Sequence, residues 1–119
     1  KKEHKINNAR VLVLGITFKE NCPDIRNSKV IDIINELKTF GCIVDVYDPW
    51  ADKDEVKHEY NLDLLNDLNK VNGRKYEGIV LAVAHNQFQE LNFLNFKNNG
   101  AVVYDVKGFL NKNIVDNRL

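Results

Sequence analysis

A long polar loop follows the first apolar run of this sequence and carries most of the side chains that could do chemistry. Lys19 and Arg26 are cations suited to an anion, and Arg26 can grip phosphate oxygens through two parallel hydrogen bonds. Both flank the start of an expected helix, whose unpaired backbone N–H groups also favour an anion. Asp24 is expected to accept a loop hydrogen bond or to orient Arg26. The loop is therefore either an anion site or simply solvated, and charge alone does not choose between them.

The two cysteines raise the question of a thiol nucleophile. Cys22 lies in the polar loop, but a nucleophilic cysteine needs a base or a lowered pKa, and no histidine is near it in sequence. We therefore expect Cys22 to be inert and Cys42, which opens an apolar run, to belong to the core. Their spacing fits neither a disulfide framework nor a zinc signature, so we expect reduced, cytosolic thiols.

Further candidates follow the other apolar runs. Asp48 precedes a proline, which favours a turn over the ribose-binding acid found at this place in dinucleotide-binding proteins. Trp50 beside it is either internal packing or a contact to a neighbouring domain. His85 is expected to cap the next helix, with a ligand contact as the alternative. Lys107 is expected to face the same crevice as Lys19.

The elements that must position these residues alternate between strand and helix. Apolar, β-branched runs predict strands over 10–15, 42–48, 78–84 and 101–106, and helices are predicted within 27–41, 61–73 and 86–100. Asn27 or Ser28 is expected to cap the first helix, and Gly41 to end it. This order predicts an α/β fold: a three-layer Rossmann-like domain with a mostly parallel sheet. Its ligand site should lie beyond the carboxyl ends of the strands.

Composition narrows the class of protein. The chain has 119 residues, 44% of them hydrophobic, and its 17 basic residues balance 17 acidic ones. That size predicts one domain, and the balanced charge argues against a nucleic-acid or membrane partner. No apolar run is long enough to span a bilayer. No methionine occurs anywhere, so we expect a piece cut from a longer protein.

The opening loop does not match a standard dinucleotide fingerprint, because Gly15 is its only glycine. Instead, "GITFKENCPDIRNS", followed by "VDVYDP", "VLAVAH" and "VYDVKG", resembles the C-terminal domain of the UDP-glucose/GDP-mannose dehydrogenase family. The resemblance runs from about Arg10 to Leu110. The segment "TFKENCPDIRNSK" is most similar to the bacterial branch that oxidises UDP-N-acetylhexosamines for capsule or O-antigen synthesis.

This resemblance implies a function and roles for particular residues. Members of the family oxidise C6 of a nucleotide sugar from alcohol to carboxylate, using NAD held by an N-terminal domain and a cysteine on a central domain. Phe18 and Lys19 match the substrate-contacting pair, and Arg26 matches the arginine that reaches the NAD pyrophosphate. Lys107 stands where many relatives have an arginine contacting substrate, so the charge is kept and the planar fork is lost. Cys22 does not match the catalytic cysteine.

We therefore expect residues 1–119 to be a single nucleotide-sugar-binding domain of a larger dehydrogenase. By itself it should be inactive, because the NAD fingerprint and the thiol are absent. The whole enzyme should be cytoplasmic and a homodimer or higher oligomer, with a UDP-sugar and its own N-terminal and central domains as partners. The alternatives are a flavodoxin-like signalling receiver and a structural assembly module. The receiver needs acidic residues where this chain has "GIT" and "AVAHN".

Overall fold

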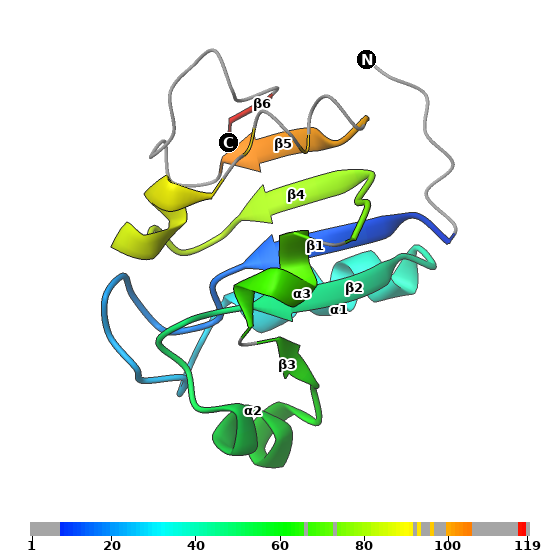
Figure 1. The fold of residues 1–119 in the computed structure, drawn as a ribbon. Helices are drawn as coiled ribbons and strands as arrows, with labels where there is room; N and C mark the ends of the chain where they lie inside the picture. The colour runs from blue at the N-terminus through cyan, green and yellow to red at the C-terminus, as the bar shows by residue number, and fades with distance from the viewer. Residues whose placement is uncertain are drawn as a thin grey trace.

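A parallel sheet with helices on both faces forms the body of the molecule (Figure 1). The computed structural model describes residues 8–65, 67–72, 74–91, 93, 96, 100–105, 117 and 118. In chain order the elements are β1 (Arg10–Leu14), α1 (Val30–Thr39), β2 (Ile43–Tyr47), α2 (Lys53–Tyr60), β3 (Leu64–Leu65), α3 (Leu68–Asn72), β4 (Gly78–Leu81), the 3-10 helix η1 (Asn86–Glu90), β5 (Val102–Asp105) and β6 (Asn117–Arg118). The predicted three-layer α/β fold is confirmed.

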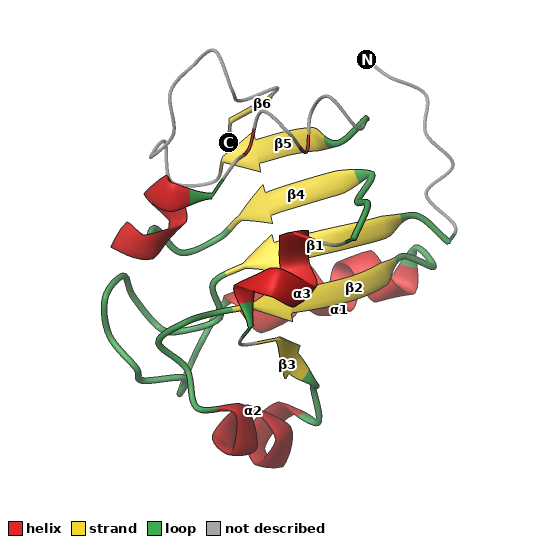
Figure 2. Cartoon of the chain, viewed as in Figure 1, coloured by secondary structure: helices red, strands yellow, loops and turns green. Residues whose placement is uncertain are grey.

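The strand order places a ligand crevice beside β1. The six strands run β3-β2-β1-β4-β5-β6, and each pair of neighbours is parallel. This is the order of the doubly wound dinucleotide-binding fold and not that of a flavodoxin-like receiver. The chain leaves β1 toward one edge of the sheet and β4 toward the other, so the switch point lies between them. The loops that follow β1, β2 and β4 lie together at the carboxyl end of the strands (Figure 2).

The position of β1 inside the sheet explains why its sequence is a continuous apolar run. Leu12 and Leu14 are fully buried in a core cluster that includes residues of α3 and η1. Val11 and Val13 point the opposite way and pack with Ile34 of α1. In Figure 1, α1 lies on one side of β1 and β2 and α3 on the other. Both faces of β1 are therefore covered, as continuous apolar strands require.

The predicted helix over 61–73 is wrong. Asn61 adopts a left-handed conformation (φ 56°) that ends α2, and Leu64–Leu65 form a short strand at the sheet edge. Of the described residues in this stretch, only Leu68–Asn72 are helical. The leucines of this stretch had a helix-like spacing, but here β pairing to β2 decides their conformation.

The helix α2 was missed because it is almost entirely polar. Val56 is its one buried residue, so no apolar stripe marks it in the sequence. Its start does carry a signal: the Asp52 carboxylate accepts hydrogen bonds from the backbone N–H groups of Asp54 and Glu55. An aspartate followed three positions later by glutamate is a helix-start pattern.

The first and third predicted helices differ from expectation at their ends. α1 begins at Val30, and Asn27 lies before it in a left-handed conformation (φ 57°), so Asn27 is not its cap. The Ser28 hydroxyl accepts a hydrogen bond from the Val30 N–H at 3.3 Å, and Gly41 (φ 85°) follows the end of the helix as expected. Of the predicted 86–100 helix, η1 occupies the first part, and most of the remainder lies outside the described residues. Among the helices described, none has the length and apolar character needed to cross a membrane.

Candidate functional site

The loop from β1 to α1 starts at a glycine that no other residue can replace without strain. Gly15 has a φ of +95°, and its N–H donates to the carbonyl of Tyr47 on β2. A Cβ at Gly15 would lie 2.5 Å from the Cβ of Val83, beyond the end of β4. The missing side chain therefore lets the loop turn directly against the neighbouring segment.

Asp48 fixes the beginning of this loop from the end of β2. Its side chain is fully buried, and its Oδ2 accepts from the backbone N–H groups of Ile16 (2.7 Å) and Thr17 (3.2 Å). Its Oδ1 accepts from the N–H groups of Trp50 (2.7 Å) and Ala51 (3.2 Å). The expected turn is present, but the same carboxylate also holds the loop after β1. Neither oxygen is open to a ribose.

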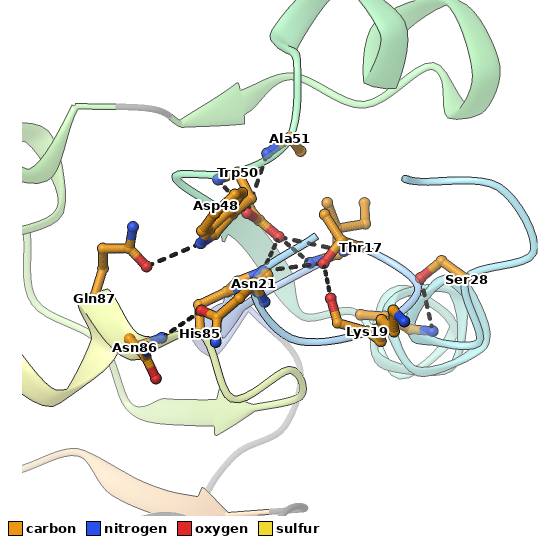
Figure 3. A network of polar contacts seen from close by, with 12 residues as sticks. Thr17, Lys19, Asn21, Ser28, Asp48, Trp50, Ala51, His85, Asn86 and Gln87 are labelled. Atoms are coloured by element: carbon orange, nitrogen blue, oxygen red, sulfur yellow. Dashed lines mark hydrogen bonds and ion pairs between the residues drawn. The ribbon is translucent and has the colours of Figure 1, made fainter. Parts of the chain in front are cut away.

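His85 joins Asp48 to the middle of the loop (Figure 3). The Nδ1 of His85 accepts from the backbone N–H of Asn21 at 2.8 Å, so the ring proton lies on Nε2. Nε2 lies 3.0 Å from Asp48 Oδ2 and 3.0 Å from the Thr17 hydroxyl. That hydroxyl donates in turn to the carbonyl of Lys19 at 2.9 Å. The imidazole is thus a neutral bridge between three segments.

The expected capping role of His85 is wrong. Its side chain makes no cap hydrogen bond to η1. Instead, the Asn21 side chain reaches across from the loop, and its Oδ1 accepts from the N–H of Asn86 at 3.0 Å. The histidine turns inward because the buried carboxylate of Asp48 and the Asn21 N–H occupy both of its ring nitrogens.

The electrostatics of this network favour an ionised Asp48. Burial raises the pKa of the Asp48 carboxyl, but hydrogen bonds from His85 and from the Ile16 and Trp50 N–H groups outweigh burial and hold the pKa below its usual value. Within the described part of the chain, every buried side-chain nitrogen and oxygen has a partner. The network is a closed, fully satisfied structural unit rather than a reactive centre.

Phe18 and Lys19 lie on the outside of the anchored loop. Phe18 is 58% exposed and Lys19 is also exposed. They border a shallow pocket of about 190 Å³ between the loop, the first turns of α1 and the residues after β4, with Lys29 on its rim. Sequence reasoning missed Lys29, although its place directly before the first helical residue could have suggested it. Two lysines at the switch point suit an anionic ligand.

Arg26 faces a different hollow of about 580 Å³, lined also by Glu55 and Glu59 of α2. Its Nε lies 3.0 Å from Asp24 Oδ1 and its Nη2 lies 3.2 Å from Asp24 Oδ2, so the expected orienting contact is confirmed. The hydrogen bonds that Arg26 donates to Asp24 lower the pKa of the Asp24 carboxyl, and the same bonds raise the pKa of the Arg26 guanidinium. The Arg26 side chain is 80% exposed. The loop therefore presents Lys19 and Arg26 on different sides.

The remaining candidates are spread over the molecule. Cys22 and Cys42 are half-buried and form no disulfide, and burial raises the pKa of the Cys42 thiol, which packs at the margin of the core. Trp50 is used internally: its Nε1 donates to Gln87 and its ring stacks 6.1 Å from that of His85. Lys107 lies outside the described residues. Among the residues that the structure describes, no group of His, Cys, Asp and Glu side chains is arranged to hold a metal ion.

Comparison with known proteins bears directly on this loop and crevice. Residues 12–112 match the sequence model of the UDP-glucose/GDP-mannose dehydrogenase family, UDP binding domain. The chain belongs to the UDP-glucose/GDP-mannose dehydrogenase family. The match begins in β1 and includes all of the loop, with Asp48, His85 and Lys107.

Curated members of the UDP-glucose/GDP-mannose dehydrogenase family are considerably longer than this chain. The UDP-N-acetyl-D-glucosamine 6-dehydrogenase of Pseudomonas aeruginosa is 41% identical over 122 residues, which cover 100% of this chain and 28% of that protein. Protein CapL of Staphylococcus aureus is 42% identical over 109 residues, covering 90% of this chain and 25% of CapL. The chain therefore spans about a quarter of the length of these relatives.

Solved structures share the fold. A UDP-glucose dehydrogenase from Pyrobaculum islandicum superimposes with a TM-score of 0.73 at 24% identity, covering 94% of this chain and 25% of that one. An NDP-N-acetyl-D-galactosaminuronic acid dehydrogenase from Methanosarcina mazei Go1 superimposes with a TM-score of 0.76 at 21% identity, covering 90% and 22%. The Rossmann-like architecture is thus that of dehydrogenases of this family.

Proposed function

We propose that this chain is the UDP-sugar-binding domain of an NAD-dependent nucleotide-sugar 6-dehydrogenase. The whole enzyme would oxidise the C6 alcohol of a UDP-N-acetylhexosamine to a carboxylate for bacterial surface polysaccharide synthesis. The observation that carries the proposal is the anchored loop, which presents Phe18 and Lys19 beside the pocket at the switch point. Family membership and the relatives' names support the same substrate class.

The side chains around the pocket suit a nucleoside diphosphate. Lys19 and Lys29 supply two positive charges for the diphosphate, and the exposed ring of Phe18 offers an apolar face to the nucleoside or sugar. Lys107 is proposed to add a further cation from the loop after β5. These residues bind and orient the ligand; they transfer no electrons and accept no proton from it.

Arg26 is proposed to contact the pyrophosphate of NAD, the bulk of which would be held by another domain of the longer protein. Bound NAD would supply the hydride acceptor, and a thiol outside this chain would supply the nucleophile. The planar guanidinium of Arg26 can donate two parallel hydrogen bonds to a pyrophosphate, but in this structure its Nε and Nη2 donate to Asp24. NAD must therefore share or displace Asp24, while the hydrogen bond from the Arg26 N–H to Asp24 Oδ1 (2.9 Å) keeps the loop shape.

Lys19→Ala is expected to weaken binding of UDP-N-acetylglucosamine to this chain by about tenfold or more, the size of a lost hydrogen bond to a charged group. A titration followed by backbone NMR shifts measures the dissociation constant and should show shifts at 18–19 and 29–33. The matched control is Lys38→Ala in the last turn of α1, which should bind like the wild type. An absence of response in the wild type at millimolar UDP and UDP-sugar would contradict the proposal and favour an assembly module.

Arg26→Ala is expected to act on the other ligand. In the whole dehydrogenase it should raise KM for NAD by about tenfold or more and leave the affinity of this chain for the UDP-sugar unchanged. Arg26→Lys keeps the charge without the fork and should recover only part of the loss. Steady-state kinetics with NAD varied at saturating UDP-sugar give the answer. An unchanged KM for NAD would rule out the assigned contact.

A further inference from the structure

Three of the most completely buried polar side chains of the described residues make none of the proposed contacts with the ligand. Asp48 and His85 have no exposed surface, and Thr17 is only 1% exposed. They come from the end of β2, the segment after β4 and the loop after β1. Burying a carboxylate and an imidazole is costly unless both are well paired. The hydrogen bonds of this network connect mainly to the loop after β1, so the network can fix the conformation of that loop.

We infer that His85 and Asp48 are a positioning pair that holds the Phe18–Lys19 segment in the shape that binds the nucleotide sugar. This inference rests on the proposed function, because it assigns a role to residues that do not themselves line the pocket. His85 and Asp48 thus influence ligand binding indirectly, by fixing the loop that contacts the ligand.

The hydrogen bonds bracket the segment on both sides. Before it, the Thr17 N–H donates to Asp48 Oδ2. After it, the Asn21 N–H donates to His85 Nδ1. Residues 18–20 are exposed and lie between these two fixed points. Since His85 and Asp48 also bond to each other, both ends of the segment are tied to one rigid unit.

The Thr17 hydroxyl extends this control to the backbone of the ligand-contacting lysine. It lies 3.0 Å from His85 Nε2 and donates to the Lys19 carbonyl at 2.9 Å. The orientation of Lys19 is thus set through one intervening side chain. Without these bonds, ligand binding would have to order the segment and lose its conformational entropy, which lowers affinity.

A histidine suits this position because it bonds in two directions with opposite polarity. Nδ1 accepts from a backbone N–H, while Nε2–H on the opposite side of the same rigid ring donates to a carboxylate. Alanine at position 85 would lose both bonds. Valine at position 17 keeps the shape of threonine and removes only the hydroxyl, and serine restores that hydroxyl.

The test uses the full chain in four variants: His85→Ala, Thr17→Val, Thr17→Ser and, as the matched control, His58→Ala. His58 is exposed on α2 and has no part in the network. Without ligand, amide hydrogen exchange is followed at Phe18, whose N–H donates to the Asp24 carbonyl and would lose protection only if the loop loosens. With ligand, the dissociation constant for UDP-N-acetylglucosamine is measured.

We expect His85→Ala to speed exchange at Phe18 and to weaken binding by about tenfold, since binding must then order the segment. Thr17→Val should weaken binding by about fivefold, Thr17→Ser should recover most of the loss, and His58→Ala should match the wild type. In the Lys19→Ala background, His85→Ala should cost less than it does alone, because the two act through the same contact.

Two results would overturn the inference. Variants that keep wild-type exchange at Phe18 and wild-type affinity would show that the network does not hold the loop. Lost affinity with exchange unchanged would show that His85 acts on the ligand by another route. If His85→Ala does not fold, Thr17→Val and Thr17→Ser carry the test. If the wild type itself does not bind, the proposed function fails, while faster exchange at Phe18 still establishes the anchor.

Discussion

Gly15→Ala is expected to destabilise the fold by about 2–5 kcal/mol, combining left-handed backbone strain with overpacking. The new Cβ would lie 2.5 Å from Val83 Cβ and 3.0 Å from the Val83 backbone nitrogen. The segment cannot move aside easily, because the N–H groups of Ala82 and Val83 both donate to the carbonyl of Leu14. The turn after β1 and the segment after β4 must therefore separate.

Urea unfolding followed by circular dichroism measures this loss. Gly100→Ala is the matched control: Gly100 has a φ of +100°, but a Cβ there would meet nothing within 4 Å. It should show only the backbone strain, about 1–2 kcal/mol. Equal losses in the two variants would show that the contact with Val83 adds nothing.

Asp48→Asn is expected to cost about 2–6 kcal/mol at neutral pH, because two buried backbone donors lose their acceptor at about 1–3 kcal/mol each. The asparagine amide keeps one oxygen and turns an NH₂ group toward backbone N–H donors. Either the Ile16 and Thr17 N–H groups or those of Trp50 and Ala51 then lose their acceptor. Each buried donor left unpaired adds its own desolvation cost.

The cost of Asp48→Asn should depend on pH. The folded-state pKa of Asp48 is lowered, so its ionisation contributes stability that is complete above its unfolded value, about pH 4. That contribution is lost as the pH falls through the folded-state pKa. The difference in unfolding free energy between wild type and Asp48→Asn should therefore be constant from pH 7 to 5 and shrink at about pH 3.

Urea titrations at several pH values check this dependence. Asp63→Asn is the control, since that carboxylate is 86% exposed in a surface ion pair with Lys57 and should matter little. A difference that stays the same down to pH 3 would mean that the charge on Asp48 is not what stabilises the loop.

The fold was largely predictable because its signals are local. The run "RVLVLG" identifies a strand covered on both faces, and the stripe of Val30, Ile34 and their neighbours identifies α1. The wrong secondary-structure predictions lie where the local sequence pattern is weak or where pairing with a neighbouring strand overrides it. α2 buries only Val56, and the Leu64–Leu65 pair is held as a strand by β2.

Of the candidate site, only the exposed residues could be proposed from the sequence. Phe18, Lys19 and Arg26 stand close together in sequence, so their charges and motif could be read directly. The network beneath them could not be read in this way, because Thr17 and His85 are 68 positions apart and Asp48 lies between them. Asp48 in a turn and His85 before a helix each had an adequate local explanation. Only the strand order brings their side chains together.

The anchoring of the loop also bears on how such domains diversify. Apart from the Thr17 hydroxyl, what Asp48 and His85 hold in the loop is backbone N–H, which every residue except proline supplies. The side chains at 18–20 can therefore change without disturbing the frame beneath them. Substitutions at positions 18–20 should therefore change the exposed side chains of the loop at little cost in stability.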